Sequence, residues 1–489
     1  MIGLSKSKIM AHRQCPKRLW LQAYQPELAS ESPTARIAME NGTQIGEAAR
    51  TIYPGGTLID TKDMSLALTQ TQTALQNHPA RPLFEGTFQH DGVLVRADIL
   101  VPNGDGTHLI EVKSSSAVKD YQIDDIAIQA WVIREAGLPL NSLFVAYTDK
   151  NFRYAGNGSY DGLIRPTDVT TVAQAIIPKI EGWVDAARKT LSGPVPDIQC
   201  GKQCKQPYTC PFLSHCNTDD ASAAAYPLDD LYKASKKFKQ TLSARGFRDI
   251  RDIPPEMLTS DQHRRIQKAA TDGKPYLDDK AGKKLRAAPY PRHYFDFETM
   301  SVGLPIWPDT AFHMVIPFQW SCHIERAPGQ IEHHEFLANG SSDPRRDCAE
   351  SLIASLGTEG PIYAYHASFE KQRLQALADE LPDLAAHLLS IAKRLICLER
   401  MTLASYYHPS MHGSWSLKRI LPTVAQQLDY ANLAVSDGIQ AQVAFAEIMS
   451  PQTSSERQAE LRRQLLEYCG RDTEGLISLA RFLENAVAC

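Results

Sequence analysis

Three side chains on two predicted neighbouring strands have the types that metal-assisted hydrolysis requires. Asp98 lies inside the predicted strand 93–101, and Glu111 and Lys113 lie in the next one, 108–114. Alternate residues of a strand point to one face, so Glu111 and Lys113 share a face, and a hairpin would bring Asp98 near them. Two carboxylates suit a hard divalent ion such as Mg²⁺, and a lysine can hold the attacking water or offset charge on a phosphate.

A second set of acids lies in the C-terminal half of the chain. Asp296 and Glu298 stand two residues apart on a predicted strand, which places both on one face. Glu370 follows another predicted strand, at the start of a helix. Tyr468 and Asp472 are four residues apart, so they are neighbours on one helical face. Together the three motifs supply four carboxylates and a tyrosine.

Five of the ten cysteines form a third candidate site. Cys200, Cys204, Cys210 and Cys216 crowd into one short stretch, and Cys15 lies far upstream. In a chain of 489 residues such a cluster indicates a metal or iron–sulfur centre rather than a disulfide scaffold. The C-x3-C pair of Cys200 and Cys204 also suits a structural zinc ion held by the four clustered cysteines. The other cysteines are scattered and are expected to be ordinary thiols.

The elements that must position the first site form an α/β unit. Helices are expected over 8–24 and 34–53, and three strands over 83–88, 93–101 and 108–114, with Asp-Gly turns between them. A helix over 120–136, a strand over 143–147 and a helix over 170–191 follow. Helix, three-stranded meander, helix and strand make an α/β core.

A basic stretch and a second α/β domain make up the rest of the chain. Residues 228–286 carry many lysines and arginines, and they are expected either to form a helix–hairpin–helix around Gly246-Phe247 that grips phosphates or to be a solvated linker. Strands are then expected over 292–298, 317–324, 332–336 and 361–365, and helices follow, ending with 456–484. The predicted domains are 1–220, the basic helical segment 221–288, and 289–489.

Composition limits the class of protein. Hydrophobic residues make up 43% of the chain and charged residues 22%, which is normal for a globular protein, and no apolar run is long enough to span a membrane. The N-terminal residues lack the apolar core of a secretory signal, so a cytoplasmic protein is expected. The formal net charge is −4, so nucleic acid would have to be bound through local basic patches.

The segment around Asp98, Glu111 and Lys113 resembles the core of the RecB-like PD-(D/E)xK nucleases. Gln129, on the following helix, matches their glutamine motif, although the aromatic residue usual four positions later is Ile133 here. The resemblance implies a restriction-endonuclease-like fold in which Asp98, Glu111, Lys113 and Gln129 are catalytic and the two acids hold a metal ion.

Two further acids are implied as metal ligands by the same resemblance. Glu85, on the preceding strand, stands where RecB-like nucleases often carry another acidic residue. These relatives also tend to have a metal-binding histidine on the early helix. The corresponding stretch 42–47 has no histidine, so Glu47 is expected to take that place.

One cysteine near the start and three after the nuclease core resemble the iron–sulfur signature of CRISPR-associated RecB-family exonucleases and AddB-type subunits. The resemblance implies a [4Fe–4S] cluster held by Cys15, Cys204, Cys210 and Cys216. Cys200 is then the spare thiol, although its role and that of Cys204 are interchangeable. Joining residue 15 to residues beyond 200 would close a very long loop and stabilise the domain. Zinc is the alternative cofactor.

The second set of acids resembles the DEDD exonucleases of the DnaQ and ribonuclease D group, which have a ribonuclease H-like fold. In that family four carboxylates hold two Mg²⁺ or Mn²⁺ ions, here implied to be bound by Asp296, Glu298, Glu370 and Asp472. Tyr468 corresponds to the tyrosine that orients the attacking water. Glu370 departs from the pattern, because the usual residue is aspartate, and a longer side chain shifts the ligand geometry.

The combined resemblance predicts a nuclease with two catalytic centres. The N-terminal site is expected to hydrolyse DNA and the C-terminal site to trim 3′ ends of DNA or RNA, in DNA repair or phage defence. Lys17, Arg18, Trp20 and the basic stretch are expected to bind backbone and bases. Two alternatives remain: a nucleic-acid-binding or scaffolding protein with one or both sites inactive, and a hydrolase of small phosphodiesters.

Overall fold

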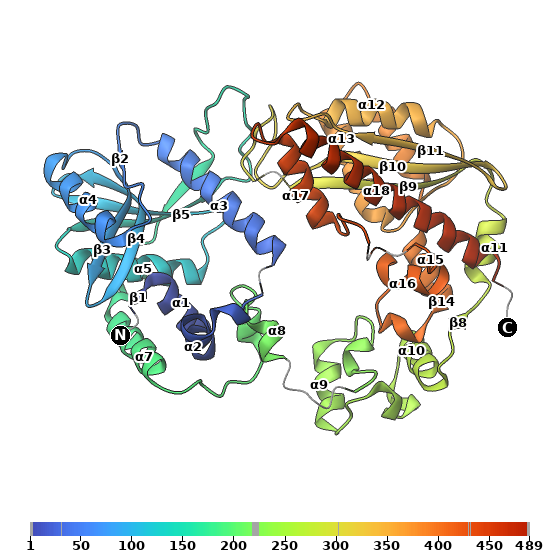
Figure 1. Ribbon diagram of the computed structural model, residues 1–489, viewed down its shortest axis with the longest axis horizontal. Helices are drawn as coiled ribbons and strands as arrows, with labels where there is room; N and C mark the ends of the chain where they lie inside the picture. Colours follow the sequence, from blue (N-terminus) through green and yellow to red (C-terminus); the bar gives the residue numbers. More distant parts are fainter. Residues whose placement is uncertain are drawn as a thin grey trace. The chain divides into compact units, whose positions relative to one another are not determined.

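The computed structural model describes residues 3–30, 32–217, 224–301, 303–428, 430 and 432–486, and the chain divides into two units (Figure 1). Unit 1 comprises Met1–Ala221 and Val302–Met314, and unit 2 comprises Ser222–Ser301 and Val315–Cys489. Each unit combines helices with a mixed β-sheet, which confirms the expected α/β class. The predicted boundary between residues 220 and 221 lies outside the described residues.

The described residues of unit 1 build a seven-stranded sheet in the order β2-β3-β4-β5-β6-β7, with β1 paired to β4. Strands β3, β4 and β5 form an antiparallel meander, whereas β5 and β6 are parallel. A parallel pair needs a crossover connection, which helix α5 (Asp120–Glu135) supplies. The strands are β1 (Leu4–Ser5), β2 (Thr57–Leu58), β3 (Leu83–His90), β4 (Val93–Asn103), β5 (Gly106–Lys113), β6 (Leu140–Thr148) and β7 (Ile164–Asp168).

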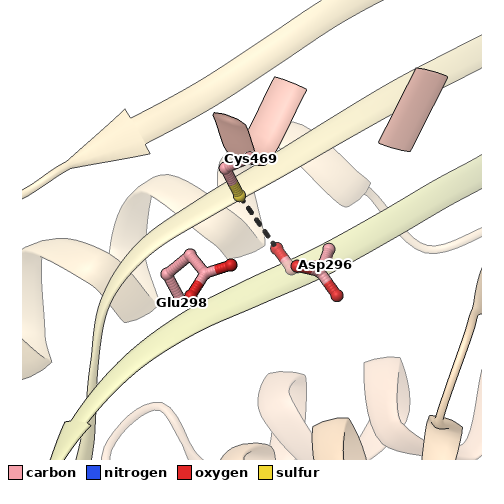
Figure 2. Close-up of side chains that lie close together, drawn as sticks. All are labelled: Asp296, Glu298 and Cys469. Carbon is pink, nitrogen blue, oxygen red and sulfur yellow. Dashed lines mark hydrogen bonds between the residues drawn. The ribbon is translucent and has the colours of Figure 1, made fainter. Parts of the chain in front are cut away.

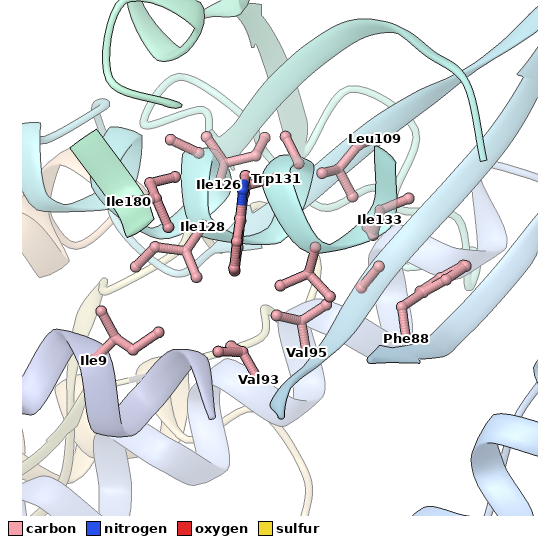
Figure 3. Close-up of a cluster of buried hydrophobic side chains, with 14 of the residues drawn as sticks. Ile9, Phe88, Val93, Val95, Leu109, Ile126, Ile128, Trp131, Ile133 and Ile180 are labelled. Atoms are coloured by element: carbon pink, nitrogen blue, oxygen red, sulfur yellow. The ribbon is translucent and has the colours of Figure 1, made fainter. Parts of the chain in front are cut away.

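Helix α5 is buried along most of its length. Figure 3 shows Trp131 of this helix within a cluster that includes Val93 of β4, Ile9 of α1 and Ile180 of α7. Polar residues in such a position must be paired, because burying an unpaired polar group costs free energy. The other helices of unit 1 are α1 (Lys6–Gln14), α2 (Pro16–Tyr24), α3 (Pro33–Thr51), α4 (Met64–Asn77), α6 (Thr170–Gln174), α7 (Ile180–Ser192) and α8 (Leu213–Cys216).

The main sheet of unit 2 has five strands in the order β11-β10-β9-β12-β13 among the described residues. Central strand β9 is antiparallel to β10 and parallel to β12. Phe295 and Phe297 of β9 lie in a hydrophobic core, so the alternation of side chains directs Asp296 and Glu298 to the other face. The strands are β9 (Arg292–Ser301), β10 (Val315–Ala327), β11 (Gln330–Leu337), β12 (Ile362–Ala364) and β13 (Leu395–Cys397).

The basic segment is part of unit 2. Its short strand β8 (Tyr276–Leu277) pairs with β14 (Tyr406–Tyr407), and Leu242, Ile266 and Leu285 share a core with Trp415. Residues 224–286 therefore pack within the folded unit. They contain α9 (Lys236–Ala244), α10 (Asp261–Asp272) and α11 (Lys280–Arg286).

Helices also follow the strands of the unit 2 sheet. They are α12 (Arg345–Leu356), α13 (Ala367–Glu380), α14 (Ala385–Arg394), α15 (Leu398–Ser405), α16 (Leu417–Val424), α17 (Gly438–Met449) and α18 (Ser455–Glu484). Within the described part of the chain, no helix combines the length and the apolar character of a membrane span.

Candidate active sites

The N-terminal candidate site forms where strands β4 and β5 separate. The ladder between them ends at Ile99, and just beyond it the Asp98 carboxylate accepts a hydrogen bond from the backbone N–H of Val112 at 2.7 Å. Glu111 is buried, and Nζ of Lys113 lies 2.6 Å from its Oε1. The structure thus brings together Asp98, Glu111 and Lys113.

Helix α5 and helix α1 complete this cluster. Gln129 donates a hydrogen bond to Oε2 of Glu111 at 2.6 Å. Two residues that the sequence reasoning missed lie beside it: Lys6 Nζ is 2.9 Å from both Glu111 and Asp125, and Lys113 Nζ is 2.7 Å from Asp125. Asp125 precedes Gln129 by four residues, so helical spacing could have revealed it. Lys6 carries no local signal, because its partners are far along the chain.

Burial and neighbouring charge act differently on the two acids of this cluster that have shifted pKa values. Burial raises the pKa of Asp98 to about 8, and the charge of Glu111 adds to the shift. Burial also acts to raise the pKa of Asp125, but Lys6 and Lys113 reverse the effect and the net pKa is lowered. A bound cation would therefore stabilise the charged form of the Asp98 carboxyl group.

Glu85 and Glu47 differ in their relation to the cluster. Glu85 has a positive φ of 58°, and the ladder between β3 and β4 skips both Glu85 and Asp98. Burial raises the pKa of Glu85, and the charge of Glu111 contributes to the shift. Glu85 also lies 3.3 Å from Arg50. Glu47 is 61% exposed in its side chain, and it pairs with the same Arg50 at 3.9 Å.

All five candidate cysteines line one small cavity in unit 1. Cys200 and Cys204 share a hydrogen bond, and Cys210 lies within electrostatic reach of Cys15 and Cys204. Cys204 and Cys210 are buried, whereas Cys200 is exposed. Residues from both ends of the unit therefore converge on a pocket lined by thiols.

Helix α1 is bonded to the cysteine-containing loop. Gln14 donates hydrogen bonds to the backbone oxygens of Gln203 and Tyr208, each at 2.7 Å. Arg18 lies over the Tyr208 ring, 4.9 Å from its centre. Because Cys15 directly follows Gln14, these contacts hold it close to the later cysteines.

The C-terminal candidate site is an open cavity of about 630 Å³ in unit 2, a volume typical of ligand pockets. Its lining includes all five predicted residues, Asp296, Glu298, Glu370, Tyr468 and Asp472. Strand β9 supplies the first two, α13 the third and α18 the last two. The structure therefore assembles the three separate motifs into one site.

Three acids of this cavity, Glu298, Glu370 and Asp472, are buried, and Asp296 is partly exposed beside them. Burial raises the pKa of Glu370 well above its usual range, and Asp296 and Glu298 raise it further. Burial also raises the pKa of Asp472, to about 6, although hydrogen bonds from tyrosines oppose the shift. Glu370 is 3% exposed, and its Oε2 has no hydrogen-bond partner among the described residues. A cation in the cavity would offset the repulsion between the carboxylates and would give the unpartnered Glu370 oxygen a ligand interaction.

Three residues of this site were missed by the sequence reasoning. Tyr430 donates a hydrogen bond to Oδ1 of Asp472, and Lys418 lines the cavity with Nζ 5.9 Å from the centre of the Tyr468 ring. Cys469 offers a sulfur within 4.8 Å of carboxylate oxygens of Asp296 and Glu298, and Figure 2 shows its thiol directed at the Asp296 backbone oxygen. The position next to Tyr468 could have suggested Cys469. Tyr430 and Lys418 do not belong to any sequence motif that could have predicted their place in the site.

Comparisons with known proteins find similar sequences and structures, but none of them indicates a function. A family described as a domain of unknown function, DUF2779, matches residues 293–416, which include Glu370 and all of β9 except its first residue, Arg292. No curated protein matches the chain. A solved structure titled "Crystal structure of SSO0001" is 14% identical, covering 44% of this chain and 85% of that one, with a TM-score of 0.21.

Proposed function

We propose that this protein is a nuclease dependent on Mg²⁺ or Mn²⁺, and that its C-terminal site trims 3′ ends of DNA or RNA. The observation that carries the proposal is the group of four acids in one cavity, three of them buried, with an unpartnered oxygen on Glu370. Hard divalent ions prefer such oxygen ligands. A ribonuclease H-like fold for unit 2 is part of the proposal, and the central position of β9 supports it.

Asp296, Glu298, Glu370 and Asp472 would hold the ions, which would stabilise the entering and leaving oxygens of a phosphodiester displacement. Tyr468 hydrogen-bonds Asp472, and burial raises its pKa, so the phenol stays protonated and can orient the attacking water. The Lys418 ammonium in the cavity wall can attract the phosphate.

We also propose that unit 1 hydrolyses DNA with a restriction-endonuclease-like fold. Asp98 and Glu111 would hold a metal ion, and Glu85 is close enough for its pKa to respond to Glu111. In the free protein Lys113 contacts Glu111 and Asp125. It is thereby positioned to hold water or to offset charge on a phosphate, while Gln129 keeps Glu111 in place.

The cysteine-lined cavity supports our proposal of a [4Fe–4S] cluster. A single zinc ion with Zn–S bonds of about 2.3 Å draws its sulfurs to about 3.8 Å from one another. The thiols that line this cavity could hold either a zinc ion or a [4Fe–4S] cluster, and the resemblance to iron–sulfur RecB-like nucleases favours the cluster. The exposure of Cys200 favours Cys15, Cys204, Cys210 and Cys216 as ligands.

Separate inactivation of the two sites tests the nuclease proposal. Asp472→Asn should reduce 3′ trimming of labelled single strands at least 100-fold, and Lys113→Met should do the same for DNA cleavage by unit 1. Glu474→Gln, on the same helix as Asp472, and Lys62→Met, on the surface of unit 1, are the matched controls. Wild-type protein that binds nucleic acid but cuts no DNA or RNA with either ion would instead favour the scaffolding alternative.

A further inference from the structure

The basic segment reaches the wall of the unit 2 cavity through Tyr232. Its ring packs edge-on against Trp415 at 5.0 Å, and Trp415 directly precedes the cavity-lining residues 416–418. The Tyr232 hydroxyl donates to Glu399 at 3.4 Å, and His366, which lines the cavity, lies 3.3 Å from the same carboxylate. The residues that follow Tyr232 therefore start near the edge of the cavity.

Several exposed, positively charged side chains follow Tyr232 in the chain or lie near it. Lys233 lies over the Tyr232 ring at 4.8 Å, and the charges of Glu399 and Arg400 both act on it. Lys236 and Lys237 follow within one turn, at the start of α9. Lys233, Lys236, Lys237 and Arg400 are exposed, and no carboxylate of the described residues lies within ion-pair distance of them. We call these four residues and His366 the basic ridge.

We infer that the basic ridge binds the sugar–phosphate backbone of a single-stranded nucleic acid whose 3′ end occupies the cavity. This inference rests on the proposed exonuclease function and adds a binding surface to it. Unpaired ammonium and guanidinium groups attract successive phosphates and release counterions. Phe369 lines the cavity with 38% of its surface exposed, and an exposed aromatic ring is suited to stacking with a base rather than to binding an acidic peptide.

A charge-reversal variant tests the ridge. Lys233→Glu/Lys236→Glu/Lys237→Glu should weaken binding of a fluorescent 20-nucleotide single strand at least tenfold at 100 mM salt, measured in the Asp472→Asn background. The slope of log Kd against log salt should fall by about 2, because each lost phosphate contact removes about 0.7. Thermal unfolding verifies that the variant folds.

A matched control carries the same charge change elsewhere in unit 2. Arg326→Glu/Arg346→Glu/Lys393→Glu alters exposed cations outside residues 228–286 and should weaken binding less than threefold. If binding of the single strand weakens equally in both variants, or does not weaken in the ridge variant, the proposed role of the basic ridge is wrong. With Asp472 intact, the ratio of kcat/KM for the 20-mer to that for a dinucleotide should fall tenfold in the ridge variant. Wild-type protein that cuts neither substrate defeats the exonuclease proposal, whereas the binding measurement still decides the ridge.

Discussion

The buried carboxylate of Glu370 is energetically unfavourable in the folded protein. The side chain is almost completely buried beside two other acids, and one of its oxygens lacks a hydrogen bond among the described residues. A buried, unpaired carboxylate destabilises the fold, and sites that retain one usually do so for function. Sequence reasoning identified Glu370 as a metal ligand that departs from the usual aspartate, but its burial could not be read from a single position.

Glu370→Gln should therefore stabilise the metal-free protein while abolishing trimming. Removing the buried charge should raise the free energy of unfolding of unit 2 by about 1–3 kcal/mol, measured by urea titration in EDTA. Glu350→Gln, at an exposed ion pair of α12, should change it by less than about 0.5 kcal/mol. A destabilised Glu370→Gln protein would mean that the carboxylate contributes to packing rather than to ion binding.

His293, at the start of β9, should make unit 2 sensitive to acid. Burial lowers the pKa of His293 to about 4 from 6.5. Below pH 6.5 His293 is protonated in the unfolded chain but stays neutral in the folded chain. The contribution of His293 to the free energy of unfolding therefore falls until about pH 4. His293 alone should contribute a loss of about 2 kcal/mol at pH 5, while the raised pKa values of Asp472 and Glu370 act in the opposite direction. Urea unfolding at pH 7.5 and 5 should show a smaller loss for His293→Gln, and His387→Gln, at an exposed position, should behave like wild type.

At the scale of elements, helix α18 joins the C-terminal site to the core. It carries Tyr468 and Asp472 on the face toward β9, and Gly475 one turn later permits close packing of α16. A Cβ at Gly475 would lie 2.5 Å from a methyl group of Leu421, which is fully buried. Lys418 lies in the first turn of α16, so this packing also positions one wall of the cavity.

Two glycine substitutions on α18 separate helix propensity from packing. Replacing glycine by alanine within a helix gains about 1 kcal/mol where space allows. Gly470→Ala meets His333 only at 3.5 Å, so it should raise the free energy of unfolding of unit 2 by about 0.5–1 kcal/mol. Gly475→Ala should lower it by about 1–3 kcal/mol because Leu421 must move. If the two substitutions change the free energy of unfolding equally in urea titrations, α16 can move to accommodate the added methyl group at little cost.

The elements were easier to predict than the partners of their side chains. Asp-Gly turns and alternating apolar residues located the hairpin with Asp98 and Glu111, because those signals are local. Lys6 and Tyr430 were missed because tertiary packing alone brings them to the acids. Glu47 was assigned by analogy with a histidine, and its role as a metal ligand stays a prediction.

At the scale of the whole molecule, the two units have separate hydrophobic cores. One core surrounds α5 in unit 1, and others lie on the two sides of β9 in unit 2. The proposed iron–sulfur cluster belongs to unit 1 alone. Damage to one core should therefore leave the other unit folded.

Calorimetry of anaerobically purified protein should show two unfolding transitions. Cys210→Ser should remove the broad absorbance expected near 400 nm, a wavelength typical of iron–sulfur clusters, and lower only the transition of unit 1, by about 10 °C. Cys348→Ser, in the unit 2 core, should lower only the other transition. A single transition, or zinc in place of iron on metal analysis, would contradict this assignment.

The division of the chain has a consequence for its synthesis. Residues 303–314 belong to unit 1 although they follow strand β9 of unit 2. Within unit 1, Thr310 accepts a hydrogen bond from the Tyr154 backbone at 3.0 Å, and Phe312 shares a core with Ile45. A ribosome therefore delivers the last piece of the first unit only after it has begun the second. Nascent chains arrested before residue 303 should remain more sensitive to protease in unit 1 than chains arrested well after residue 314.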